Sequence, residues 1–187
     1  IVLDGREQRG AYTATSIVGT PLDPGRLAAT LRYAAGVELG VMVEYLAAVY
    51  SLDRTAGANG SNLRDDTRAS RAELLRLAIG EMRHLREVNS LLFDLHRQSG
   101  QGGAFEPALG IATEIPGGNG VAGPPVRFRR LTPDVLTDFV RVEQPSWTVD
   151  GLYGNILATY EAQGMVAQAS VVRSIMADGA DHYAAFR

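Results

Sequence analysis

The chain has 187 residues, of which 45% are hydrophobic and 21% charged, with a formal net charge of −3 and no cysteine. This composition is typical of a globular protein, and the length suits a single domain over residues 1–187 with a substantial core. The weakly acidic charge and the lack of a basic block argue against nucleic acid as a partner, and the lack of cysteine excludes disulfides, zinc–thiolate sites and thiol nucleophiles.

The longest apolar stretch, residues 34–50, carries the two glutamates Glu38 and Glu44. An ordinary membrane span would not tolerate both of them. We therefore expect no membrane partner and, by default, a cytoplasmic location.

The first half of the chain is predicted to form a helical hairpin. Residues 1–22 show no steady hydrophobic period and are expected to form an extended arm. A first helix is predicted over 24–52, since Asp23 can cap it and Pro24 suits its first position. A turn rich in glycine and asparagine follows, and a second helix is predicted from about residue 65 to residue 98.

The second half begins with residues 99–130, where glycine and proline are frequent and a long irregular crossover is predicted. Thr132 and Pro133 can start a short helix, and a third main helix is expected from Thr148 to a break at Gly164. A fourth helix follows from about residue 168 to 186. Two helical hairpins joined by a long crossover predict an all-α, four-helix bundle of the ferritin-like kind.

Three of the main helices carry acidic or histidine side chains in their most apolar stripe. In the first helix, Glu38 is the one charge among residues spaced by fours and threes. In the second helix Glu81 has such a position, and His84 lies about 60° round the same side. In the fourth helix His182 lies in the stripe, with Asp178 one turn before it and a glycine between them that makes room for close approach.

The positions of these side chains along their helices agree within each hairpin. Glu38 and Glu81 lie almost equally far from the first turn, so they are level. Counted from the turn at Gly164, Asp178 is level with Asp150. We infer that the two hairpins share this depth.

Several carboxylates in the core of a bundle are costly unless something neutralises them. A divalent metal does so, and carboxylate with imidazole suits Fe or Mn. The Glu-x-x-His spacing of Glu81 and His84 aims both side chains at one ion. The alternatives are that the spacing has no function, or that a glutamate pairs with Arg83 or Arg86. Two acid-plus-histidine pairs with a third carboxylate favour a site for one or two Fe or Mn ions.

Other polar residues near these stripes receive other interpretations. Glu44 lies on another face of the first helix and is expected at a subunit contact or in solvent. Glu161 is expected at a solvated helix end, and His96 at the surface near the end of the second helix. Tyr45 could line a pocket, or pack in the core with its hydroxyl on a neighbour.

The segments VELGVMVEYLAAVYSL and AIGEMRHLREVNSLL carry a family pattern: a glutamate seven residues before Tyr-Leu, then Glu-Met-x-His-Leu, an asparagine and a leucine pair. The matching residues are Glu38, Tyr45, Leu46, Glu81, Met82, His84, Leu85, Asn89, Leu91 and Leu92. The pattern resembles the ferritin-like domain of violacein- and rebeccamycin-type bis-indole biosynthesis enzymes, such as iminophenylpyruvate dimer synthase. LTPDVLTDFVRVEQP, TVDGLYGNI and IMADGADHYAAF resemble later segments, so the likeness covers most of the chain from about residue 27.

The resemblance implies a set of metal ligands, namely Glu38, Glu81, His84, Asp178 and His182. The third helix of that family usually begins with Gly-Glu, where this sequence has Asp150-Gly151. Asp150 is therefore assigned as a ligand, with a shorter acid placed one position earlier. Two shortened carboxylates, Asp150 and Asp178, indicate a rebuilt site with a single metal, a different metal or none.

These observations together predict a metal-dependent redox enzyme of specialised-metabolite biosynthesis. Fe or Mn would bind O₂ or a peroxide and oxidise or couple a small amine, imine or aromatic amino-acid-derived substrate, with Tyr45 as the candidate catalytic residue. One alternative is a metal-free ferritin-like tailoring enzyme, cyclase or binding protein that reuses the bundle cavity. Another is an iron-oxidising or iron-storage bundle. The first helix is apolar nearly all round, which favours a homodimer.

Overall fold

The computed structural model describes residues 19–52, 62–100, 102–115, 123–144 and 149–186, and within these ranges it contains helices and no strand. The helices are α1 (Pro24–Ser51), α2 (Asn62–Gln98), α3 (Pro133–Glu143), α4 (Val149–Ala162) and α5 (Val166–Ala185). The predicted all-α class is confirmed. The arm over 1–18 and the first hairpin turn lie outside the described residues.

The helices begin and end where local chemistry predicts. The side chain of Asp23 accepts a hydrogen bond of 2.9 Å from a first-turn N–H of α1. Thr132 caps α3 in the same way at 3.3 Å. After α2 and α4 the chain turns at Gly100 and Gly164, whose φ angles of 65° and 68° suit glycine.

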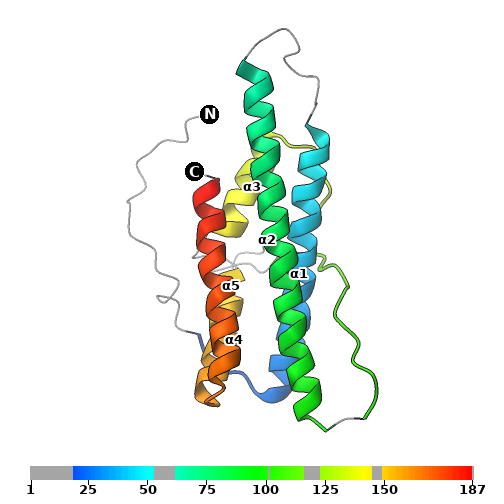
Figure 1. Cartoon of the computed structure of the whole chain (residues 1–187), viewed down its shortest axis with the longest axis vertical. Helices are drawn as coiled ribbons and strands as arrows, with labels where there is room; N and C mark the ends of the chain where they lie inside the picture. The colour runs from blue at the N-terminus through cyan, green and yellow to red at the C-terminus, as the bar shows by residue number, and fades with distance from the viewer. Residues whose placement is uncertain (1–18, 53–61, 101, 116–122, 145–148, 187) are drawn as a thin grey trace.

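The helices form two antiparallel pairs, α1 with α2 and α4 with α5 (Figure 1). The third position of the bundle is shared by two short helices. In Figure 1, α3 lies at the height of the C-terminal half of α5, which it contacts, and α4 lies at the height of the N-terminal half. The third position is therefore interrupted between Glu143 and Val149, near mid-height.

The apolar core is in two parts, one toward each end of the bundle. The first part joins the start of α1, the end of α2, α4 and α5, and includes Leu31, Leu91, Ile156, Tyr160 and Val172. The second part joins the rest of α1, the middle of α2 and α3, and includes Val41, Tyr45, Leu77, Val135 and Phe139. Along α1 the boundary falls between Ala35 and Val37, and along α2 between Ala78 and Val88. Glu38, Glu81 and His84 lie at or directly beside this boundary.

Residues 102–115 and 123–130 form no helix, as predicted for the crossover, and they return along α1 (Figure 1). The N–H of Ala112 donates to the carbonyl of Gly36 at 2.9 Å. Glu44 is 3% exposed and accepts a hydrogen bond from the N–H of Arg127. The prediction that Glu44 faces solvent or another subunit is therefore wrong, because the crossover covers that face of α1. This face of α1 therefore no longer supports a homodimer, which stays a prediction.

By length and composition α1 could cross a membrane, but most of its apolar window is buried inside the fold. Glu38 and Glu44 within it are buried too. Both observations agree with a core helix of the bundle.

The close approach of the crossover to α1 predicts the effect of one substitution. A Cβ at Gly36 would lie 2.9 Å from the carbonyl oxygen of Gly110 and 3.1 Å from the backbone nitrogen of Ala112. We expect Gly36→Ala to lower the free energy of unfolding by about 1–3 kcal/mol through overpacking, although alanine is the better helix former by about 1 kcal/mol. Gly151→Ala, with nothing within 4 Å of its added methyl, is the control and should not destabilise. Chemical denaturation measures both, and an undiminished stability of Gly36→Ala would contradict the packing.

Candidate metal centre

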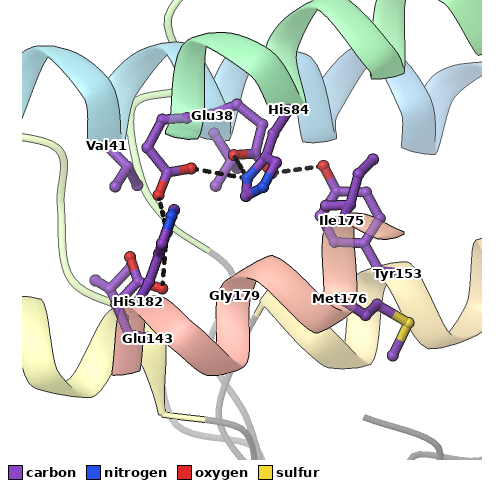
Figure 2. A pocket seen from close by; sticks show the side chains of 12 residues that line it. Glu38, Val41, His84, Glu143, Tyr153, Ile175, Met176, Gly179 and His182 are labelled. Carbon is purple, nitrogen blue, oxygen red and sulfur yellow. Dashed lines mark hydrogen bonds and ion pairs between the residues drawn. The ribbon is translucent and has the colours of Figure 1, made fainter. Parts of the chain in front are cut away.

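Buried charged side chains from four helices meet at the boundary between the two parts of the core (Figure 2). Glu38 comes from α1, Glu81 and His84 from α2, and His182 from α5, and each is at most 4% exposed. Glu143, the last residue of α3, joins them with 9% of its side chain exposed. The structure thus brings together four of the residues selected from the sequence and adds Glu143.

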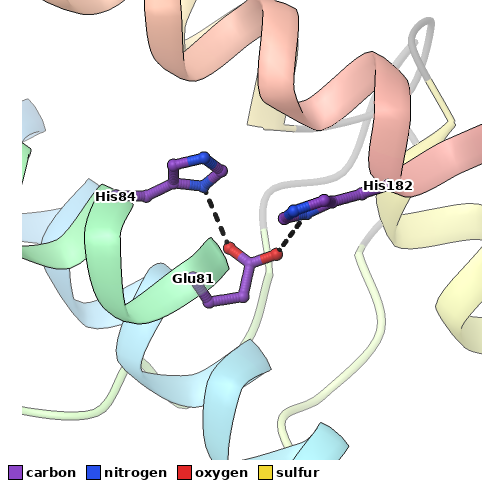
Figure 3. A group of neighbouring side chains, drawn as sticks. All are labelled: Glu81, His84 and His182. Carbon is purple, nitrogen blue, oxygen red and sulfur yellow. Dashed lines mark hydrogen bonds and ion pairs between the residues drawn. The ribbon is translucent and has the colours of Figure 1, made fainter. Parts of the chain in front are cut away.

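Glu81 lies between the two imidazoles (Figure 3). One carboxylate oxygen, Oε2, is 3.2 Å from Nδ1 of His84, and the other, Oε1, is 2.7 Å from Nδ1 of His182. The rings are stacked with their centroids 5.3 Å apart. The potential ligand atoms of these three residues lie within 4.8 Å of one another, so all three face the same small space.

Each imidazole also has a second carboxylate near its Nδ1. Oε2 of Glu38 is 3.5 Å from Nδ1 of His84, and Oε2 of Glu143 is 3.8 Å from Nδ1 of His182. The centre therefore consists of two similar halves, each with one histidine and one glutamate, that share Glu81.

A tyrosine holds the outer glutamate of each half. The hydroxyl of Tyr153 donates to Oε1 of Glu38 at 2.5 Å, and the hydroxyl of Tyr45 donates to Oε1 of Glu143. The ring of Tyr45 packs edge-on against Phe139 in the core. Of the two interpretations of Tyr45, the contacts agree with core packing and a hydroxyl on a neighbour. Its catalytic role stays a prediction.

Burial and the nearby charges set the protonation of the cluster. Burial and the charge of Glu81 raise the pKa of Glu38 to about 8. Burial opposes the charge on Glu81, but its interactions with His182, His84 and Glu38 outweigh it and place the pKa of Glu81 well below its usual range. Burial likewise opposes the charge of His84, yet hydrogen bonds to Glu38 and Glu81 raise its pKa to about 11. Metal binding would displace the protons that these groups hold.

The donor set fits a divalent metal. Nδ1 of His182 is buried and has no hydrogen-bond partner in the described part of the chain, because its short contact with Glu81 lacks hydrogen-bond geometry. A small cavity of about 30 Å³ adjoins these atoms, which is room for about two water molecules. Glutamate oxygens with imidazole nitrogens suit Fe or Mn. A buried imidazole nitrogen beside a small cavity and carboxylate oxygens is in the surroundings that a metal ligand requires.

Asp178 approaches the imidazoles from their other side. Its Oδ2 is 3.0 Å from Nε2 of His84, 3.7 Å from Nε2 of His182 and 3.5 Å from the guanidinium of Arg83. A carboxylate that accepts the Nε2–H proton leaves Nδ1 free for a metal. In this arrangement Asp178 contacts the Nε2 atoms of the histidines, whereas the three glutamates contact their Nδ1 atoms. Its assignment as a ligand stays a prediction.

The carboxylate of the third bundle position comes from Glu143, which the sequence analysis did not select. Its signal was present, because Glu143 stands in the Phe-x-x-x-Glu-x-Pro segment that resembles the family and follows the buried residues Phe139 and Val142. Asp150 belongs to the first turn of α4, but its side chain lies outside the described part of the structure. The prediction for Asp150 therefore stays untested. Tyr153 was also missed, since a lone tyrosine in a helix gives no sequence signal.

The space for His182 is provided by Gly80 on α2. A Cβ at Gly80 would lie 2.4 Å from Nε2 and 2.7 Å from Cε1 of His182. Gly179, which was expected to make room, instead lines the cavity. Glu161 is exposed, as predicted, and pairs with Arg173 at 2.5 Å. His96 lies near the end of α2, but it is half-buried and its ring packs against Phe105.

Fold and centre together define a helical bundle with a carboxylate–histidine cluster in its core. The model of the ferritin-like family matches residues 31–183, a range that includes every side chain of the cluster. The chain belongs to the ferritin-like family. Comparisons with curated proteins and with solved structures gave no significant match. The narrower likeness to bis-indole biosynthesis enzymes stays a prediction.

The fit of His182 against Gly80 predicts a coupled pair of substitutions. Gly80→Ala should lower the free energy of unfolding by about 1–3 kcal/mol, because the buried ring must move. In a His182→Ala background the same change should be neutral, or stabilising by up to about 1 kcal/mol, since only the helix propensity remains. Denaturation of the four proteins gives the coupling between the two sites. An equal cost in both backgrounds would show that the two residues are not in contact.

Proposed function

We propose that the chain is a metal-dependent redox enzyme that uses Fe or Mn and acts on a small amine, imine or aromatic amino-acid-derived substrate in specialised-metabolite biosynthesis. The observation that carries this proposal is the convergence of two imidazole Nδ1 atoms on a shared, buried glutamate, with one of them lacking a hydrogen bond. Burial of such a set without a counter-charge is costly.

The residues of each half have definite roles in this proposal. Glu38 and His84 would hold one ion, Glu143 and His182 would hold another, and Glu81 would be shared. When bound, the metal supplies the redox chemistry, by activating O₂ or a peroxide. Outer contacts orient the ligands: the two tyrosine hydroxyls bind one oxygen of each outer glutamate, and Asp178 accepts from Nε2 of His84.

A small cavity and a larger groove adjoin the cluster, and their sizes support separate sites for a small oxidant and a larger substrate. The internal cavity of about 30 Å³ suits a ligand of a few atoms. On the outer side of His182, between α2 and α5, lies a groove of about 320 Å³, the size of a small-molecule site. Its lining combines the apolar Leu75 and Ile79 with Arg76 and Arg83. We place the organic substrate in this groove. The proposal includes no nucleic acid or membrane partner and assumes a cytoplasmic location.

Metal content is the first test. Protein purified without chelators should contain about one or two Fe or Mn ions per chain by elemental analysis. Glu81→Ala should lose most of the metal, because this carboxylate contacts both imidazoles, while circular dichroism shows that the helices persist. Glu161→Ala is the matched control, since Glu161 is an exposed glutamate paired with Arg173, and it should keep the wild-type content.

The same experiment separates the alternatives. Wild-type protein that stays free of metal after anaerobic loading with Fe(II) would sink the redox proposal and favour a metal-free tailoring enzyme, cyclase or binding protein. O₂ consumption that needs only Fe(II) would indicate an iron-oxidising or iron-storage bundle. O₂ consumption that needs an added organic substrate supports the proposal.

A further inference from the structure

The cluster has one carboxylate fewer than the arrangement typical of dinuclear bundles. That arrangement takes a glutamate from each of two helices and a Glu-x-x-His pair from each of the other two. In this chain Glu38 and Glu143 supply the single glutamates, and α2 supplies a complete pair. On α5, the residue three positions before His182 is Gly179. The carboxylate of the second pair is therefore absent from the sequence.

The position of this carboxylate borders the internal cavity. Gly179 lines the internal cavity together with Glu81, Glu143 and His182, and Figure 2 shows its place on α5. The unpartnered Nδ1 of His182 lies at the same cavity. Asp178 does not fill the gap, since its Oδ2 lies at Nε2 of His84.

The net charge of the site indicates when the missing carboxylate at Gly179 is needed. The glutamates 38, 81 and 143 supply three negative charges, and Arg83 offsets the charge of Asp178 at 3.5 Å. The site with one divalent ion therefore has a net charge of −1 and repels a further anion. With two divalent ions the net charge is +1, and a buried excess charge is costly unless an anion accompanies it. A fourth carboxylate is therefore needed only with the second ion.

We propose that a small external carboxylate occupies the space at Gly179 and enters together with the second metal ion. This inference rests on the proposed metal-dependent function and adds a class of ligand to it. The rest of the cavity wall is apolar, formed by Val37, Val41, Val142, Ile175 and Met176. The ligand is therefore a monocarboxylic acid whose carboxylate reaches the metals and whose remaining part is apolar. In the described conformation the volume suits formate or acetate.

The stoichiometry of metal binding tests this inference without a measurement of activity. Metal-depleted full-length chain is titrated with Co(II), with binding followed by absorbance and calorimetry, in chloride alone and with formate or acetate at equal ionic strength. We expect about one ion per chain in chloride and about two with formate or acetate. Phenylacetate is a third arm: a response to it as well indicates that the carboxylate can belong to a larger substrate, and a response to formate and acetate alone indicates a free small acid.

Two variants with side chains of the same size distinguish the effect of a negative charge at position 179 from the effect of side-chain volume. Gly179→Glu supplies the fourth carboxylate from the chain, so it should bind about two ions in chloride and lose the response to formate. Gly179→Gln has the same shape without the charge, and it should bind about one ion under all conditions. Circular dichroism checks that both variants fold. The titrations of the wild-type protein test the inference even if the variants do not fold.

Three results would overturn the inference. Wild-type binding of two ions in chloride alone would show that the site needs no external anion, and binding of a single ion whatever acid is present would show that the gap does not admit one. In both cases metal binding, and with it the proposed function, would survive. No binding of Co(II) at all, together with no Fe or Mn in purified protein, would remove the proposed function and this inference with it.

Discussion

The structure depends on one constraint: three glutamates and two histidines must be buried at a single level of a helical bundle. Glu81 connects them, because its two oxygens contact Nδ1 of His84 on its own helix and Nδ1 of His182 on α5. The rest of the fold accommodates this contact. The apolar core is divided into two parts around the charged layer, and α2 has a glycine at position 80 where the second imidazole approaches.

The interruption of the third bundle position serves the same layer. Ten residues separate Glu143 from Tyr153, and in a continuous helix they would stand about 15 Å apart along the axis. In the structure Glu143 ends one helix, and Tyr153 follows the start of the next. Glu143 reaches His182, and Tyr153 reaches Glu38. The break between α3 and α4 lets one position of the bundle supply two side chains to one layer.

Much of this arrangement could be predicted from the sequence, because it follows from helical periodicity. Glu38, Glu81, His84 and His182 stand in apolar stripes, and a stripe identifies the face that turns inward. The helix ends could be predicted too, because a cap or a glycine turn depends only on residues that are neighbours in the sequence. Glu143 was missed because the residue opposite Asp178 was sought by counting back from Gly164 along one helix. The third position of the bundle is instead built from two helices, α3 and α4. The error for Glu44 has a different cause, since periodicity gives the face of a helix and says nothing of an irregular segment that covers it.

The two halves of the centre resemble each other in composition but differ in how well they are satisfied by the protein alone. His84 has Asp178 at 3.0 Å on Nε2 and two glutamates within 3.5 Å on Nδ1. His182 has a longer contact of 3.7 Å on Nε2, and its Nδ1 makes no hydrogen bond. Gly179 lines the cavity beside His182, so the half with the poorer hydrogen bonding is also the half that adjoins a cavity. The asymmetry therefore arises from α5, where the chain keeps the histidine of the pair and replaces the carboxylate with a glycine.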